Sequence, residues 1–337
     1  MKNYFISWFY SEQADDESYY PSVGGSSSSA EFQYVYWRCI YVLYRSALIT
    51  NKNVVTDWLF FTNVKNLPTV DGVDFAQFFE ENHIKVIYLE LTRKTPKDWY
   101  GAWRNQFYLF DVLEYLKDLD GNHLILDSDC VVPYSLETLY KEIAKEGVLT
   151  LPIDYSVEKD INGCSIEEMR KVYSSFFSVD NPSDLLYMGG EFIAMSSEAV
   201  RELLPVFYEI WDKNYRLYEQ KQKKLNEEAH TLSLCYYRMG KQNELGRKYI
   251  RRIWTDMNLD QVQENDYKLP IWHLPAEKKF GFALLFKALK DKSGITPQEL
   301  FKMSDNAMKL TATKEQRRRN WYFRYGKNKL KRVLKLK

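Results

Sequence analysis

Two aspartates one residue apart, Asp127 and Asp129, follow the apolar run 124–126. Three consecutive apolar residues between polar ones indicate a buried parallel strand, and in open α/β sheets ligands bind beyond the carboxyl ends of the strands. Carboxylate oxygens suit hard cations such as Mg²⁺ and Mn²⁺, which complete their coordination with substrate phosphates. The pattern predicts a metal platform that faces a nucleotide diphosphate; the alternative is an ordinary solvated acidic turn.

The elements that must position these aspartates alternate along the first part of the chain. Strand patterns and helix patterns follow one another at residues 4–9 (strand), 31–49 (helix), 58–62 (strand), 75–81 (helix), 85–89 (strand), 103–116 (helix) and 124–126 (strand). This alternation is typical of βαβ units. We therefore expect an α/β fold with a mostly parallel sheet flanked by helices.

The second half of the chain continues the mixture of strands and helices. We expect strands at 148–153 and 185–195, a helical or loop insertion at 162–180, and helices at 196–224, 232–239, 276–290 and 296–310. The strand at 185–195 contains Gly189 and Gly190, and glycines within a strand often mark a close approach of the backbone to a ligand. Both glycines are therefore candidates for the binding site.

Length and composition exclude several classes of protein. A chain of 337 residues is long enough for one large domain or two smaller ones. We expect neither a signal peptide nor a membrane span, because the N-terminal apolar run is interrupted by polar residues and no apolar run reaches eighteen residues. The four cysteines are scattered, as is typical of reduced thiols in a cytosolic protein.

The C-terminal segment is strongly basic, although the net charge of the chain is only +1. Residues 314–337 contain eleven Lys or Arg and one Glu, a net +10, whereas the preceding residues carry 36 basic and 45 acidic side chains. Interspersed aromatic and aliphatic residues make an interfacial segment that binds anionic lipid the favoured interpretation. A solvated tail is the next alternative; nucleic-acid binding is disfavoured, because no nucleic-acid-binding module accompanies the segment.

The order of five motifs resembles that of metal-dependent, retaining GT-A glycosyltransferases, in particular the blood-group-type galactosyl and N-acetylgalactosaminyl transferases. The motifs occupy residues 59–63, 99–110, 126–129, 187–190 and 226–230. A later segment, 271–281, is similar to the His and Lys element of glycogenin and of lipooligosaccharide galactosyltransferases. The resemblance covers roughly residues 55–260, by motif order and spacing and not by extended identity.

The resemblance implies a GT-A (Rossmann-like) domain at 1–275, followed by a helical basic extension at 276–337. It implies a Mn²⁺ or Mg²⁺ site and a UDP-sugar donor. The metal ligands would be Asp127, Asp129 and His273. The donor would be contacted by Asp127, Arg104, Gly189, Gly190 and Lys278. Glu191 departs from the family, which more often has a small or apolar residue there.

The implied catalytic residues are Glu228, the candidate nucleophile for retention, and its neighbour Glu227. In an inverting alternative either glutamate is the general base toward the acceptor hydroxyl, and both also suit the first turn of a helix. The leading hypothesis is a bacterial enzyme that transfers a hexose to a saccharide or lipid-linked acceptor during surface polysaccharide or lipopolysaccharide synthesis. It would be cytoplasmic and peripheral at the inner face of the cell membrane. A catalytically silent glycan-binding or assembly protein is the remaining alternative.

Overall fold

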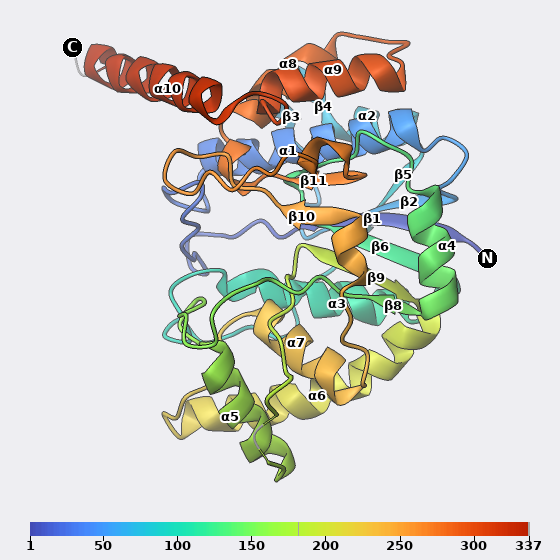
Figure 1. The fold of residues 1–337 in the computed structure, drawn as a ribbon, viewed down its shortest axis with the longest axis vertical. Coiled ribbons are helices and arrows are strands. Elements are labelled where there is room, and N and C mark those ends of the chain that lie inside the picture. Colours follow the sequence, from blue (N-terminus) through green and yellow to red (C-terminus); the bar gives the residue numbers. More distant parts are fainter. Residues whose placement is uncertain (181, 336–337) are drawn as a thin grey trace. The chain divides into compact units, whose positions relative to one another are not determined.

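The computed structural model describes residues 1–180 and 182–335 (Figure 1). The chain divides into two compact units. The first unit comprises residues 1–33, 53–127 and 136–249, and the second comprises 34–52, 128–135 and the chain from 250 onward. The last two residues of the predicted basic extension, 336 and 337, lie outside the described residues. The division into 1–275 and 276–337 stays a prediction.

The first unit is built on a six-stranded sheet with the strand order β5-β2-β1-β6-β9-β8. Its strands are β1 (Asn3–Phe9), β2 (Asp57–Thr62), β5 (Ile84–Tyr88), β6 (Asn122–Leu126), β8 (Val148–Leu149) and β9 (Phe192–Ser196). The four strands from β5 to β6 pair in parallel, and β9 is antiparallel to both β6 and β8. The prediction of an α/β fold with a mostly parallel sheet flanked by helices is confirmed.

Helices of the first unit cover this sheet and bury a large aromatic core. They are α2 (Phe75–Glu81), η1 (Arg104–Phe107), α3 (Tyr108–Leu116), α4 (Glu137–Glu146), α5 (Ile166–Phe177), α6 (Ser197–Glu219), α7 (Glu228–Arg238) and η2 (Leu245–Lys248), with a small hairpin β3 (Thr69–Val70) and β4 (Val73–Asp74). Phe110 of α3 lies parallel to Phe207 of α6, with 3.5 Å between ring centroids. Such contacts fix the helix that precedes β6.

Polar contacts hold the carboxyl ends of the central strands together. Asn63, just after β2, accepts a hydrogen bond from the Ser11 amide at 2.8 Å and donates one to the Ser11 carbonyl at 2.9 Å. The Ser7 hydroxyl of β1 donates to the carbonyl of Leu126, the last residue of β6, at 2.9 Å. The segments that follow β1, β2 and β6 therefore start from one fixed edge, where an α/β sheet binds its ligands.

The second unit contains a small sheet and the C-terminal helices. Its elements are most of α1 (Ala30–Thr50), β7 (Cys130–Val131), β10 (Ile250–Arg252), η3 (Asp266–Lys268), β11 (Ile271–His273), η4 (Pro275–Glu277), α8 (Gly281–Lys290), α9 (Pro297–Met308) and α10 (Lys314–Lys335). The strand order is β10-β11-β7, with β11 and β7 antiparallel. Helices α8 and α9 lie side by side (Figure 1, orange-red).

Two predicted strands are shorter than expected, because side chains take the place of strand neighbours. The strand expected at 148–153 ends at Leu149, since the Thr150 amide donates to the side chain of Asn243 at 3.1 Å. The strand expected at 185–195 begins only at Phe192, since the Met188 amide donates to the Ser233 hydroxyl at 2.8 Å. Residues 185–191 therefore belong to no regular strand, although Met188 forms an isolated antiparallel bridge with Pro152.

Two helix boundaries also differ from the prediction. The helix expected to reach residue 224 ends at Glu219, and Lys221 adopts a left-handed φ of 56°. The helix expected at 232–239 begins at Glu228. The predicted insertion at 162–180 contains α5, which starts with a capping box formed by Ser165 and Glu168.

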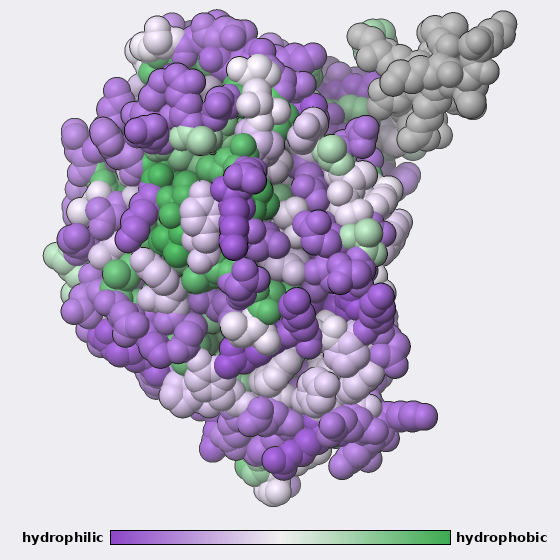
Figure 2. Space-filling model, turned by 180° about the vertical axis from the view of Figure 1, so that it is seen from behind, coloured by the Kyte–Doolittle hydropathy of each residue, from purple (hydrophilic) through white to green (hydrophobic). Residues whose placement is uncertain are grey.

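The hydropathy of the surface and of the helices can be compared with what a membrane span requires. Hydrophilic side chains (purple) dominate the face drawn in Figure 2, with smaller apolar areas (green) between them. In the described part of the chain no helix is both long and apolar enough to cross a bilayer.

The buried His123 of β6 makes stability depend on pH. It is fully buried, its Nε2 lies 3.0 Å from the Leu119 carbonyl, and burial lowers its pKa to about 4. The folded protein keeps this ring neutral, whereas the unfolded chain takes up a proton near pH 6.5. Stability is therefore lost as the pH falls from 6.5 toward 4, by about 3 kcal/mol in total.

We predict that His123→Phe, which keeps a ring of similar size but cannot titrate, removes this pH-dependent loss. Urea unfolding of both proteins at pH 7 and pH 4 measures it. The loss of unfolding free energy between the two pH values should be smaller in the variant by about 3 kcal/mol. An identical loss in both proteins would show that His123 is not the titrating group.

Candidate functional site

The two aspartates of the predicted metal platform follow β6, as the sequence indicates. The Asp127 amide donates to the Glu191 carbonyl at 3.2 Å, so this residue is held by the segment before β9. Asp129 is 1% exposed, and its carbonyl accepts from the Leu274 amide at 3.0 Å. The pairing of β7 with β11 places Cys130 opposite His273. The antiparallel register thus brings the late histidine of the chain to Asp129.

Two side chains, one lysine and one histidine, converge on one oxygen of Asp129. Lys278 Nζ lies 2.7 Å and His273 Nε2 lies 3.2 Å from Asp129 Oδ2. Burial by itself would raise the pKa of Asp129, but the charges of Lys278 and His273 outweigh it and hold that pKa well below its usual range. Asp129 is therefore a carboxylate at neutral pH.

The residues predicted as metal ligands form one group. One ligand atom each of Asp127, Asp129 and His273 lies within 4.8 Å of the other two. Two carboxylates and one imidazole suit Mn²⁺ better than Mg²⁺, which prefers oxygen ligands alone. The donor set fits the predicted cation, which would compete with Lys278 for Asp129.

A second group of carboxylates surrounds Glu228, the first residue of α7. Glu228 is partly exposed, but its Oε2 is shielded from solvent and has no hydrogen-bond partner among the described residues. Burial and the charges of Glu227, Asp127 and Glu191 raise its pKa well above the usual value. The negative charge of an ionised Glu228 would therefore be poorly stabilised in this structure.

Both predicted glycines allow the backbone to pass close to these carboxylates. A Cβ atom on Gly190 would lie 2.7 Å from Glu228 Oε1. A Cβ atom on Gly189 would collide with the carboxylate of Glu191, whose side chain is also buried. The glycines thus make room for acidic side chains; their predicted contact with a donor stays a prediction.

Glu227 has the opposite environment to its neighbour. It is 4% exposed, and its carboxylate accepts hydrogen bonds from the Tyr187 hydroxyl at 3.0 Å and from the Asn162 side chain. His230 Nε2 lies 3.6 Å away. These contacts tie the loop at Asn162 to the start of α7. Of the two predicted catalytic residues, Glu228 is the one with an unused carboxylate oxygen.

Arg104 lies in η1 and bonds to the loop that follows β1. Its guanidinium is 4% exposed and donates to the carbonyls of Asp16 and Glu17 at 2.8 and 3.2 Å. The neighbouring Asn105 side chain donates to the carboxylate of Glu12 at 2.7 Å. In this structure Arg104 therefore shapes a loop, and its predicted contact with a donor stays a prediction.

The sequence reasoning missed Glu12, a buried carboxylate that organises the serine-rich loop. Its partners are the amide and hydroxyl of Ser18 and the hydroxyls of Tyr20 and Ser27, besides Asn105. The small residues at 21–29 are compatible with a mobile linker. The composition of this segment does not show that its hydroxyl groups donate hydrogen bonds to the carboxylate of Glu12.

Comparisons with known proteins give little beyond the structure itself. No family model matches the chain, and no curated protein does. Among solved structures, the apo form of mouse xyloside xylosyltransferase 1 is similar with a TM-score of 0.46 and 11% identity, over 81% of this chain and 97% of that chain. At this level the likeness supports no conclusion about activity, which must be argued from the site.

The contacts of Asp129 generate a prediction about metal binding. Asp129→Asn should weaken Mn²⁺ binding at least tenfold, because one carboxylate ligand is lost. It should also lower the unfolding free energy by about 3 kcal/mol, because Lys278 keeps a shielded charge without its partner. Calorimetric titration with Mn²⁺ and urea unfolding measure the two effects. The exposed Asp118→Asn is the control.

A double variant separates the two effects. Adding Lys278→Met to Asp129→Asn removes the stranded charge, so stability should recover while Mn²⁺ binding does not. Wild-type Mn²⁺ affinity in Asp129→Asn would contradict the assignment of Asp129 as a ligand.

The contrast between the two glutamates generates a prediction about stability. A raised carboxyl pKa stabilises the fold only at low pH, and that stabilisation is lost as the pH rises through the folded-state pKa. Glu228→Gln should therefore stabilise the protein at pH 8, by about 1–3 kcal/mol, and less at pH 5. Glu227→Gln should destabilise it, because Tyr187 and Asn162 donate to different oxygens of the carboxylate and an amide keeps only one of the two oxygens. Urea unfolding at both pH values measures this; equal effects of the two variants would contradict it.

Proposed function

We propose that the protein is a metal-dependent glycosyltransferase that moves a hexose from a UDP-sugar to a saccharide or lipid-linked acceptor. The observation that carries this proposal is the Asp127–Asp129 turn after β6, with His273 and Lys278 gathered on Asp129. Such a group can hold a cation and meet a diphosphate. The order of motifs that resembles GT-A glycosyltransferases supports the same activity.

The chemistry of sugar transfer explains the cationic side of the group. When the bond between the anomeric carbon and the diphosphate breaks, its electron pair leaves with the phosphate oxygen. A cation held by Asp127, Asp129 and His273 would supply Lewis acidity to that leaving group. Lys278, 2.7 Å from Asp129, provides a fixed positive charge that can serve the same phosphates.

The acidic group around Glu228 suits the other half of the reaction. As the diphosphate departs, the anomeric carbon becomes positive, and this charge favours the ionised form of Glu228 that is disfavoured in its absence. Glu228, having lost its proton to solvent, can then bond to the anomeric carbon as the bond to the diphosphate breaks. In a second step an acceptor hydroxyl displaces the carboxylate from the opposite side and gives its proton to the released diphosphate, which restores the carboxylate and gives retention. In the inverting alternative Glu228 removes the proton of that hydroxyl directly. The anomeric configuration of the product, determined by NMR, distinguishes the two.

The direct test of the activity uses the purified protein with a panel of UDP-hexoses. We expect release of UDP that requires Mn²⁺ and stops when the ion is chelated. Absence of UDP release from every donor, with and without saccharide acceptors, would favour a silent glycan-binding or assembly protein instead.

Glu228→Gln should lower sugar transfer by several orders of magnitude while donor binding persists, because the shape is kept and the charge is lost. Turnover of the active donor and its binding measured by calorimetry test this. The variant is predicted to be the more stable protein, so lost activity cannot come from unfolding. Unchanged turnover would show that Glu228 is not catalytic and serves only as an acidic residue in the first turn of α7.

The proposed cellular setting is bacterial surface polysaccharide or lipopolysaccharide synthesis at the inner face of the cell membrane. It rests on the basic composition of the C-terminal segment and on the resemblance. Arg317 of α10 forms an ion pair with Asp260 at 3.1 Å, so deletion of all of 314–337 would also remove contacts inside the second unit. A shorter deletion is the better test of membrane binding.

We predict that removing residues 326–337, which carry six Lys or Arg and no acidic residue, weakens binding to anionic vesicles. Each basic residue near such a surface contributes about 1 kcal/mol, and salt should weaken the binding of the full chain. Sedimentation with phosphatidylserine vesicles measures the effect, and neutral vesicles are the control. Equal sedimentation of both proteins at low salt would rule out a membrane role for this segment.

A further inference from the structure

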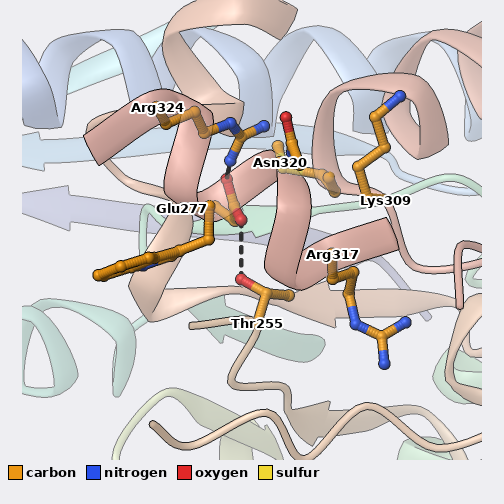
Figure 3. A pocket seen from close by; sticks show the side chains of 8 residues that line it. Thr255, Glu277, Lys309, Arg317, Asn320 and Arg324 are labelled. Atoms are coloured by element: carbon orange, nitrogen blue, oxygen red, sulfur yellow. Dashed lines mark hydrogen bonds and ion pairs between the residues drawn. The ribbon is translucent and has the colours of Figure 1, made fainter. Parts of the chain in front are cut away.

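A buried glutamate, Glu277, closes the turn η4 in the second unit. Its carboxylate accepts hydrogen bonds from the Thr255 hydroxyl at 2.8 Å and from the Gly281 amide at 2.9 Å. Its third partner is Arg324 Nη1, at 2.7 Å (Figure 3). The side chains of Arg324 and Glu277 are 14% and 8% exposed. A shielded ion pair thus connects η4 to the helix α10.

This turn carries residues of the metal site on both of its sides. Leu274, just before η4, donates its amide to the Asp129 carbonyl at 3.0 Å, and Lys278, just after it, places Nζ 2.7 Å from Asp129 Oδ2. Glu277 is bonded to Lys278 in the chain, so the contacts that hold the Glu277 side chain also restrain the backbone from which Lys278 extends. Whatever anchors Glu277 therefore also sets the approach of Lys278 to Asp129.

Side-chain contacts of Arg317 and Arg324 connect the first part of α10 to other segments of the second unit. Arg324 Nη2 also donates to the Ala307 carbonyl near the end of α9, at 2.9 Å. About two helical turns earlier, Arg317 pairs with Asp260 at 3.1 and 3.2 Å, and both side chains are less than 10% exposed. Arg318 and Arg319 on the same helix are exposed. The helix thus divides its arginines between buried anchors and surface charge.

We propose that Arg324 is a positioning residue of the metal site, which acts through Glu277 to hold Lys278 against Asp129. Its link to catalysis rests on the proposed function, whereas the placement of Lys278 does not. The beginning of α10 is then part of the site, and only the later residues remain for a membrane role. Loss of Arg324 leaves the shielded Glu277 carboxylate with two hydrogen-bond donors but without its cation, so the turn relaxes and Lys278 separates from Asp129.

The test compares Arg324→Gln with Arg319→Gln, which removes the same charge from an exposed position of the same helix. The first readout is the rate at which an amine-reactive acetylating reagent modifies Lys278, measured by mass spectrometry on the folded proteins. Arg324→Gln should raise this rate about tenfold, because an amine held in an ion pair is protected, and Arg319→Gln should leave it unchanged. The second readout is Mn²⁺ affinity by calorimetry, which should change only in Arg324→Gln.

Further variants keep the proposal falsifiable if Arg324→Gln does not fold. Arg324→Lys keeps the positive charge but cannot bond to Glu277 and to the Ala307 carbonyl with two separate nitrogens. It should show an intermediate acetylation rate of Lys278. Glu277→Gln should match Arg324→Gln, and the double variant should add nothing. A wild-type rate for Lys278 in the folded variants would overturn the positioning role. The acetylation rate of Lys278 can be measured without a UDP-sugar. If Arg324→Gln raises this rate but the protein never releases UDP, the proposed function is wrong and the positioning role of Arg324 stands.

Discussion

Asp129 and Glu227 are buried carboxylates, and the structure around them must compensate their charge. The turn after β6 supplies two acidic side chains, and α7 and the segment before β9 add more. A buried carboxylate must pair with a cation, take up a proton or find several donors. Asp129 takes the first course with Lys278 and His273, and Glu227 takes the last. Glu228 Oε2 has no hydrogen-bond partner among the described residues, and the raised pKa of Glu228 favours the protonated form, which is the second course.

The sequence was sufficient for the fold class and for the position of Asp127 and Asp129 after a central strand, because hydrophobic periodicity and strand length are local properties. It also named His273 and Lys278, which tertiary pairing places at Asp129. It was not sufficient for the limits of β8 and β9, where single side chains such as Asn243 and Ser233 replace strand neighbours. Contacts between residues 45 or more positions apart leave no periodic signal.

The difference between Glu227 and Glu228 shows the same limit within two adjacent residues. Both precede or begin α7, and both are acidic, so composition and spacing treat them alike. Their directions differ, because the first turn of the helix sends one side chain toward Tyr187 and Asn162 and the other toward Gly190. Glu227 and Glu228 therefore have different environments at the start of α7, and the sequence motif does not distinguish them.

The basic C-terminal helix illustrates how one charge pattern can serve two purposes. In water an exposed arginine contributes little to stability, since its pairs are solvated and screened. Arg317 and Arg324 escape this limit because their partners, Asp260 and Glu277, are shielded from solvent. The net charge of the segment predicts an affinity for anionic surfaces, but it cannot tell which arginines are already used. Only the positions that remain exposed can contribute to such an affinity, so the charge available to a membrane is smaller than the charge that the sequence displays.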